Sequence, residues 1–168
     1  MTLIIRKLDT KKWSPVSPDW LQLGDIEADP LGDLSTFDNA LSVFVVEQES
    51  AVERVIAALI ARQNSPRNVG YVLIDPRTLE ELGFKIEEKQ GTTPDDEVNE
   101  WHRNIIELSG NALVLLARTI RDECELKAML PDDWEKALGT SYKAGYIEEQ
   151  AIQIKNKETR QKIGLPEK

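Results

Sequence analysis

Cysteine and histidine are nearly absent from this sequence. Its 168 residues include one cysteine, Cys124, and one histidine, His102. Cys124 has no partner for a disulfide within the chain, and no Cys-x-x-Cys or Cys/His cluster suggests a zinc site. There is no stretch of about 18 apolar residues, and the apolar run near Met1 is too short for a signal peptide. We therefore predict a cytoplasmic protein that does not contact a membrane.

The common sequence signatures of enzymes are also missing. The chain has no glycine-rich phosphate loop, no G-x-S-x-G motif and no H-E-x-x-H motif. His102 stands between Trp101 and Arg103, and we expect it to be an ordinary surface histidine of a helix. The sequence therefore predicts no catalytic residue, no metal ligand and no cofactor.

Lysine and arginine are absent from residues 13–53, which carry nine acidic residues. The whole chain has a formal net charge of -9, although residues 1–12 carry four bases. Direct binding to nucleic acid requires clustered Lys and Arg, so this charge distribution argues against it. An uncompensated acidic segment instead predicts attraction to a basic protein partner.

Length and composition fit one globular domain over residues 1–168, with 40% hydrophobic residues. Residues 11–40 include prolines and scattered apolar side chains, which is typical of an ordered irregular segment. The last residues, 160–168, are predicted to be a frayed tail. The sequence carries no indication of the oligomeric state.

The middle of the chain has the pattern of an α/β fold. Residues 41–47 and 69–75 are nearly continuously apolar, as in strands that are buried on both faces. The amphipathic stretch 49–63 between them predicts a helix, and hence a β-α-β unit with parallel strands. Residues 3–7 read as a short strand and 84–89 as an edge strand. We expect an α/β fold with a small, mainly parallel sheet, and an α+β arrangement is the alternative.

The C-terminal half is predicted to be helical. Apolar side chains recur with heptad spacing from Val98 to Thr119, without a phase shift at Gly110. This spacing predicts one long helix over residues 95–124, packed across the sheet. Shorter helices are expected at 130–139 and 148–157.

Three groups of carboxylates resemble known metal sites. Residues 25–33 alternate like a calcium loop but have Pro30 where glycine is required and Thr36 where a bidentate glutamate is required. Asp75 with Glu87 and Lys89 resembles the D…E-x-K core of a metal-dependent nuclease. Asp75 precedes Pro76, however, which also suits the N-cap of a helix.

The third group lies in the predicted long helix. Glu97 and Glu100, followed by Asp122 and Glu125, resemble the paired carboxylates of all-α nucleotide pyrophosphatases, although the second pair is reversed. In that family two facing helices hold magnesium and a triphosphate. On one continuous helix the two pairs would be about 33 Å apart, which is too far to share a metal ion.

The functional hypothesis is therefore a noncatalytic acidic protein of the antitoxin, immunity or assembly-subunit type. It would bind a basic macromolecular partner through the base-free segment, with exposed aromatic side chains as anchors. The alternative is a metal-dependent phosphohydrolase or nuclease that uses clustered carboxylates. The residues predicted to bind the partner are Trp13, Trp20, Asp25, Glu27, Asp29, Asp33, Phe37 and Asp38.

Overall fold

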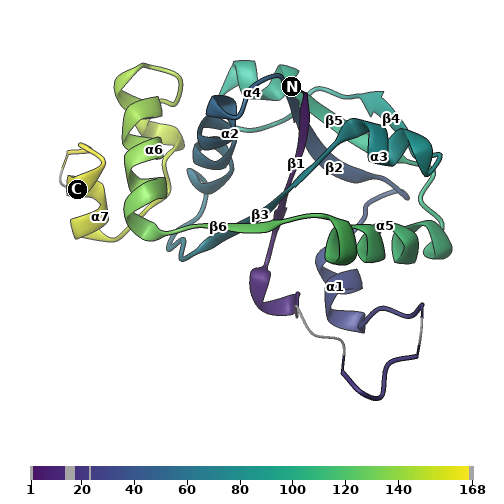
Figure 1. The fold of residues 1–168 in the computed structure, drawn as a ribbon. Coiled ribbons are helices and arrows are strands. Elements are labelled where there is room, and N and C mark those ends of the chain that lie inside the picture. Colours follow the sequence, from purple (N-terminus) through teal and green to yellow (C-terminus); the bar gives the residue numbers. More distant parts are fainter. Residues whose placement is uncertain (1, 14–17, 23, 167–168) are drawn as a thin grey trace.

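The computed structural model describes residues 2–13, 18–22 and 24–166, and this part of the chain forms an α/β fold (Figure 1). One antiparallel sheet has six strands in the order β4-β5-β2-β1-β3-β6. The strands are β1 (Leu3–Leu8), β2 (Leu41–Val46), β3 (Val69–Ile74), β4 (Lys85–Glu88), β5 (His102–Ile106) and β6 (Leu126–Met129). The helices are α1 (Ala28–Asp33), α2 (Ser50–Ile60), α3 (Pro76–Glu81), α4 (Asp96–Glu100), α5 (Gly110–Glu123), α6 (Pro131–Lys143) and α7 (Lys157–Lys162), with 3-10 turns η1 (Thr10–Lys12) and η2 (Glu149–Ala151).

The strand β1 lies in the middle of the sheet, which corrects the prediction of a mainly parallel sheet. Strands β2 and β3 run in the same direction and are joined through α2, as the β-α-β pattern predicts. They are not neighbours, because β1 inserts between them and pairs antiparallel with both. The strands expected near 43–47, 69–74 and 84–89 are confirmed, and β4 lies at an edge.

Each face of the sheet has its own hydrophobic core. Side chains alternate between the faces along a strand, so Ile5 packs with α2 and α6, whereas Ile4 and Leu8 pack with α1, α3 and α5. Ile4 and Ile5 are both fully buried. The charged residues Arg6 and Lys7 continue this central strand.

The predicted helix over 95–124 is wrong. Its middle, residues 102–106, is the strand β5, which pairs with both β2 and β4. Glu107 adopts a positive φ of 59°, and Ser109 then caps α5 by accepting a hydrogen bond from the amide of Ala112. Leu116 and Ile120 of α5 are fully buried, whereas Leu115, which continues the heptad spacing of the predicted helix, is 37% exposed.

The remaining helices differ from their predicted bounds. The helix expected at 130–139 is α6, which continues to Lys143, and the helix expected at 148–157 is wrong, because this range holds only the 3-10 turn η2 and the first residue of α7. The described residues of 11–40 contain the end of η1, the helix α1 and a tight turn at 37–40. The described part of the C-terminal tail packs against the α2 side of the sheet, and Ile163 is fully buried. None of the helices in the described ranges is long and apolar enough to span a membrane.

Candidate functional site

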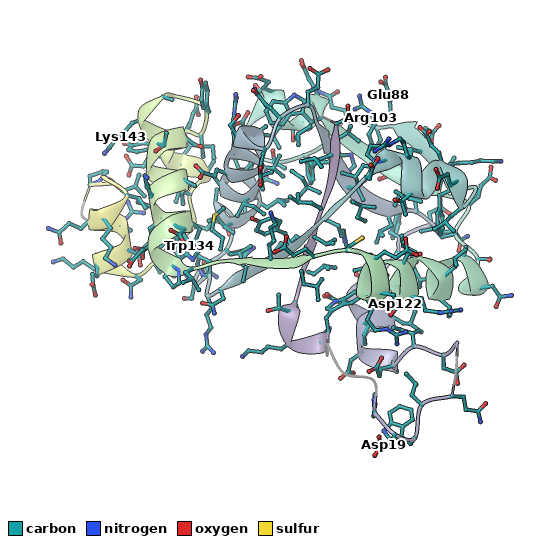
Figure 2. The ribbon with its side chains drawn as sticks, viewed as in Figure 1. Asp19, Glu88, Arg103, Asp122, Trp134 and Lys143 are labelled. Atoms are coloured by element: carbon teal, nitrogen blue, oxygen red, sulfur yellow. The ribbon has the colours of Figure 1, made fainter. Side chains whose placement is uncertain are left out.

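The acidic segment folds partly into a lobe below α5, defined here as residues 18–22 and 24–33 (Figure 1). Figure 2 shows Asp19 at the outer tip of this acidic lobe, farthest from the sheet. Trp20 beside it is 72% exposed. A large apolar side chain at such exposure is available for contact with another molecule.

Two predicted partner-binding residues instead hold the lobe to the sheet. Trp13 is 4% exposed, and its indole Nε1 donates a hydrogen bond of 2.7 Å to Asp33 Oδ2. The same carboxylate oxygen accepts a 2.8 Å hydrogen bond from the backbone amide of Asp9. Trp13 is therefore not an exposed anchor, and Asp33 connects the end of α1 to the end of β1.

Two other lobe residues contact an arginine of α5. Glu27 Oε2 lies 3.6 Å from Arg121 Nη1, and the Asp25 carbonyl accepts a hydrogen bond of 3.3 Å from the same nitrogen. Arg121 is therefore a cation beside the base-free segment, although its shortest ion pair, of 2.7 Å, is with Asp122. The carboxylates of Asp25 and Asp29 are exposed and form no ion pair with any described residue.

Phe37 and Asp38 lie outside this lobe, in the tight turn before β2. Phe37 and Ala40 exchange two backbone hydrogen bonds of 3.1 Å across Asp38 and Asn39, which both have a φ of 54°. Positive φ at both central residues is the geometry of a type I′ turn, which favours Asp and Asn. The turn projects Phe37 outward, 87% exposed.

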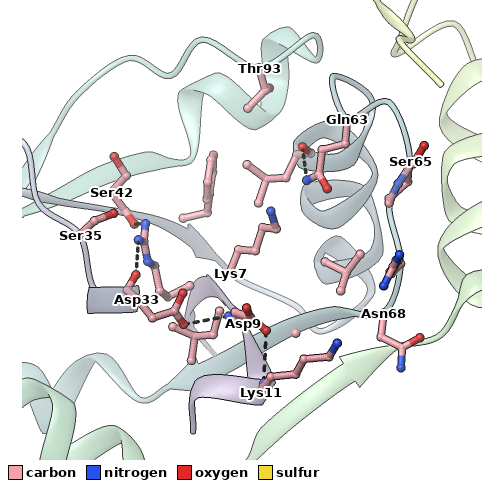
Figure 3. Close-up of a pocket in the computed structure, with 18 of the residues that line it drawn as sticks. Lys7, Asp9, Lys11, Asp33, Ser35, Ser42, Gln63, Ser65, Asn68 and Thr93 are labelled. Atoms are coloured by element: carbon pink, nitrogen blue, oxygen red, sulfur yellow. Dashed lines mark hydrogen bonds between the residues drawn. The ribbon is translucent and has the colours of Figure 1, made fainter. Parts of the chain in front are cut away.

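A hollow of about 740 Å³ lies on the α2 side of the sheet (Figure 3). We call it the cationic hollow because Arg6, Lys7, Lys11 and Arg67 line it, against Asp9 and Asp33 as the acids. Figure 3 shows Lys7 pointing into its centre, with Gln63 and Ser65 on one side and Ser42 on the other. A smaller hollow of about 420 Å³ adjoins it, sharing Arg6 and His102 and adding Lys89 and Phe37.

The hollow lies where two central strands separate. Strands β1 and β2 pair only as far as Ile5 and Phe44. Beyond that point β1 continues along β3 and β2 continues along β5. The Arg6 guanidinium bridges the split, donating to the Ser42 carbonyl at 2.9 Å and to the Asp33 carbonyl at 3.5 Å. Its Nε is buried and has no hydrogen-bond partner among the described residues.

Burial lowers the pKa of both basic residues of β1. For Arg6 the main cause is loss of water, which the charge of Asp33 partly offsets. The pKa of Lys7 is lowered first by burial and then by the neighbouring Arg6, with Asp33 and Asp9 acting in the opposite direction. The Lys7 ammonium forms no hydrogen bond or ion pair with any residue in the described ranges. A half-buried cation beside another cation is an unfavourable arrangement, and a bound anion would relieve it.

Hydrogen bonds fix the two walls of the hollow. On one side, Asn99 accepts from the amide of Thr93 at 2.6 Å and donates to its carbonyl at 3.0 Å. On the other side, the buried Trp134 donates to the Arg67 carbonyl at 2.9 Å. Both walls are therefore held by side chains of the core, which is typical of a preformed binding site.

His102 occupies a different place from the one predicted. It lies on the strand β5, is 9% exposed and packs edge-on against Phe44 with ring centroids 5.2 Å apart. Its Nδ1 lies 2.8 Å from the Lys89 carbonyl. A carbonyl only accepts, so Nδ1 carries the hydrogen. His102 therefore fixes the loop that carries Lys89.

The metal-site alternatives find no support in the geometry. Three strands separate Asp75, which follows β3, from Glu87 in β4, so the two are roughly 19 Å apart at about 4.8 Å per strand. Asp75 instead caps α3 by accepting from the amide of Arg77. Over the described ranges, no group of three or more His, Cys, Asp and Glu side chains is placed to hold a metal ion.

The pyrophosphatase resemblance fails for a related reason. Its two carboxylate pairs belong to α4 and to the end of α5, which pack on opposite faces of the sheet. Glu97 is paired with Arg54 and Asp122 with Arg121. The two pairs therefore face different parts of the molecule.

Comparison of the chain with protein-family models, with curated proteins and with solved structures yields no match. The sequence analysis missed the cationic hollow, although a signal was present: three of the four bases in residues 1–12 line it.

Proposed function

We propose that the protein is a noncatalytic binding protein whose acidic lobe docks a basic macromolecular partner. The observation that carries the proposal is the 72% exposure of Trp20 on a lobe with no Lys or Arg of its own. Isolated exposed apolar residues are common, but a tryptophan among unpaired carboxylates combines two elements of an interface. The carboxylates attract a basic surface, and the indole contributes contact area.

The geometry divides the predicted binding residues by role. Asp25 and Asp29, with Asp19 at the tip, have exposed carboxylates that would face the partner. Trp13 and Asp33 hold the lobe in place. Glu27 lies 3.6 Å from Arg121 at the base of the lobe, while Phe37 and Asp38 belong to a separate turn beside the hollows.

This arrangement predicts fast, salt-sensitive association. Exposed charges accelerate encounter and fix orientation more than they add affinity, because water and salt screen them. A buried aromatic anchor would then slow dissociation. Charge reversal in the lobe should mainly lower the association rate, whereas Trp20→Ala should mainly raise the dissociation rate.

The test uses a photo-crosslinking amino acid at position 20 of the full chain, in extract of the native host. A discrete adduct with a basic protein is expected, and Asp25→Lys with Asp29→Lys should remove it at low salt. The matched control is Glu80→Lys with Glu87→Lys, which makes the same charge change at exposed positions elsewhere. Adduct formation that survives the lobe reversal, or that the control reduces equally, would refute the proposal.

A further inference from the structure

The cationic hollow has more positive charge than its own residues neutralise. Arg6, Lys7, Lys11 and Arg67 line it, against the two carboxylates of Asp9 and Asp33. Both carboxylates raise the pKa of Lys7 and so offset part of the positive charge, which leaves two cations in excess. The side chains of Lys7, Lys11 and Arg67 have no ion-pair partner in the described part of the chain. A protein with a net charge of -9 thus holds a local excess of cations in this cavity.

Central strands rarely carry adjacent charged residues unless the site has a use for them. Arg6 and Lys7 occupy such a strand, between β2 and β3. Arg6 fills the split between strands and is held by two carbonyls, so it contributes a fixed charge beneath the hollow. Lys7 is on the opposite side of the strand, among hydroxyl and amide groups, and has an ammonium free to bind.

The lining indicates the chemistry of the ligand. Besides the cations, the hollow presents hydroxyl and amide groups from Ser42, Gln63, Ser65, Asn68 and Thr93. Such a surface suits a strongly hydrated anion with several acceptor oxygens and does not suit an apolar molecule. A volume of about 740 Å³ is within the range of small-molecule sites.

We propose that the cationic hollow binds a phosphorylated small molecule, with Lys7, Lys11 and Arg67 contacting its phosphate oxygens. Phosphate is favoured over carboxylates, citrate included, because each phosphate group concentrates three acceptor oxygens and up to two charges on one centre, whereas a carboxylate offers two oxygens and one charge. The exposed Phe37 ring in the adjoining hollow offers a stacking surface to a planar group attached to the phosphate.

The experiment is titration calorimetry of the full chain at low salt with pyrophosphate, ADP and citrate. We expect both phosphate compounds to bind and citrate to bind at least about tenfold more weakly. If ADP binds more tightly than pyrophosphate, the Phe37 ring contributes to binding by stacking on the base. If the two affinities are equal, the protein recognises the phosphates alone. Absence of binding by both phosphate compounds, or equal binding of citrate, would overturn the proposal.

Matched variants separate the site from the net charge. Lys7→Met and Arg67→Gln should each weaken pyrophosphate binding by about tenfold or more, whereas Lys136→Met, at an exposed position outside the hollow, should change it less than about twofold. Equal losses in all three variants would mean nonspecific attraction and would refute the assignment. Thermal unfolding of each variant verifies that it folds.

The last titration uses a short single-stranded oligonucleotide. If it binds more than about tenfold more tightly than ADP with a steep salt dependence, the ligand is a nucleic-acid strand and the small-molecule proposal is wrong. The lobe variants Asp25→Lys and Asp29→Lys should leave pyrophosphate binding in place. Failure of the partner proposal and failure of this one are therefore distinguishable.

Discussion

The Trp13 indole donates a hydrogen bond to the Asp33 carboxylate over 2.7 Å, which joins the residues after β1 to the end of α1. Trp13 is 4% exposed and Asp33 is half-buried, so this bond is partly shielded from water. It places the acidic lobe against the sheet and orders one wall of the cationic hollow.

Trp13→Phe should therefore destabilise the fold. The phenyl ring retains much of the apolar contact but removes one of the donors to the half-buried carboxylate of Asp33, at a cost of about 1–2 kcal/mol. Urea unfolding measures this difference. Asp29→Asn is the control, because Asp29 is exposed and lies in α1, the helix that ends at Asp33. It should change stability by less than about 0.5 kcal/mol. Equal stability of Trp13→Phe and the native chain would contradict a structural role for the bond.

A second prediction concerns Arg54, whose guanidinium binds Asp95 through Nε at 2.6 Å and Nη2 at 2.8 Å. The same group lies 3.6 Å from the ring centroid of Tyr146, and the hydrogen bond with Asp95 is the main cause that raises the pKa of Arg54. Asp95 is 1% exposed and also caps α4.

Asp95→Ala should cost about 2–4 kcal/mol of unfolding free energy, because it removes the buried one of the two acidic partners of Arg54, leaving Glu97, and also removes the cap of α4. Asp96→Ala, one residue further and exposed, should cost far less. Chemical denaturation of the two variants compares them directly. If both variants lose a similar amount of unfolding free energy, the loss comes from removing an acid at the start of α4 and not from breaking the ion pair with Arg54.

Lys7 gives a pH-dependent prediction. Its pKa is lowered by folding from 10.5, so the unfolded chain holds this proton more tightly than the folded protein does. The resulting penalty is fully present at neutral pH and disappears as the pH rises through the lowered pKa toward 10.5. Lys7→Met, which removes the charge but keeps the chain length, should therefore be more stable than the native chain near neutral pH.

Calorimetric melting temperatures at about pH 7 and about pH 10 test this sign. The advantage of Lys7→Met should shrink at the higher pH, and Lys136→Met should show no comparable change. A loss of stability in Lys7→Met at neutral pH would indicate that Lys7 serves the fold. Greater stability combined with lost pyrophosphate binding is the pattern expected of a binding residue.

Cys124 is predicted to react slowly. Burial, followed by the charge of Glu123, raises the pKa of its thiol to about 11. At about pH 8 roughly one thiol in a thousand is then ionised, about a hundredfold fewer than for an ordinary cysteine. A thiol-exchange reagent should modify the folded protein slowly and the urea-unfolded protein at the normal rate. Equal rates in both states would contradict the burial of Cys124.

The elements that the sequence predicted correctly are those with local signals. The buried strand β3 and the helix α3 are bounded by Asp75 and Pro76, whose cap and first-turn positions are readable from the chain. The sheet order was not readable, because β1 carries Arg6 and Lys7 and looks like a short exposed strand. Its two partners lie far along the chain, and no local pattern specifies them.

The error in the C-terminal half has a different origin. In β5 the buried side chains on one face are polar, His102 and Asn104. Strand alternation of apolar residues is therefore missing, and the spacing of Trp101, Ile105 and Leu108 matches a helix instead. Pairing with two neighbouring strands outweighs that local preference.

The candidate site was only partly predictable. The acidic lobe follows from composition alone, but the roles of Trp13 and Asp33 depend on a contact across 20 residues. The cationic hollow combines β1, the end of α2 and the loop before α4, so only tertiary structure brings its cations together. Charged residues in a central strand are the sequence feature that would have indicated it.

The insertion of β1 between β2 and β3 has a kinetic consequence. Ile4 pairs with Val45 on one side and with Ile74 on the other, so the centre of the sheet closes only after two long loops have lost their freedom. Such nonlocal pairing is typical of slow folders. Until β1 is captured, β2 and β3 each expose an apolar edge to other chains, and crowded refolding should favour aggregation at that stage.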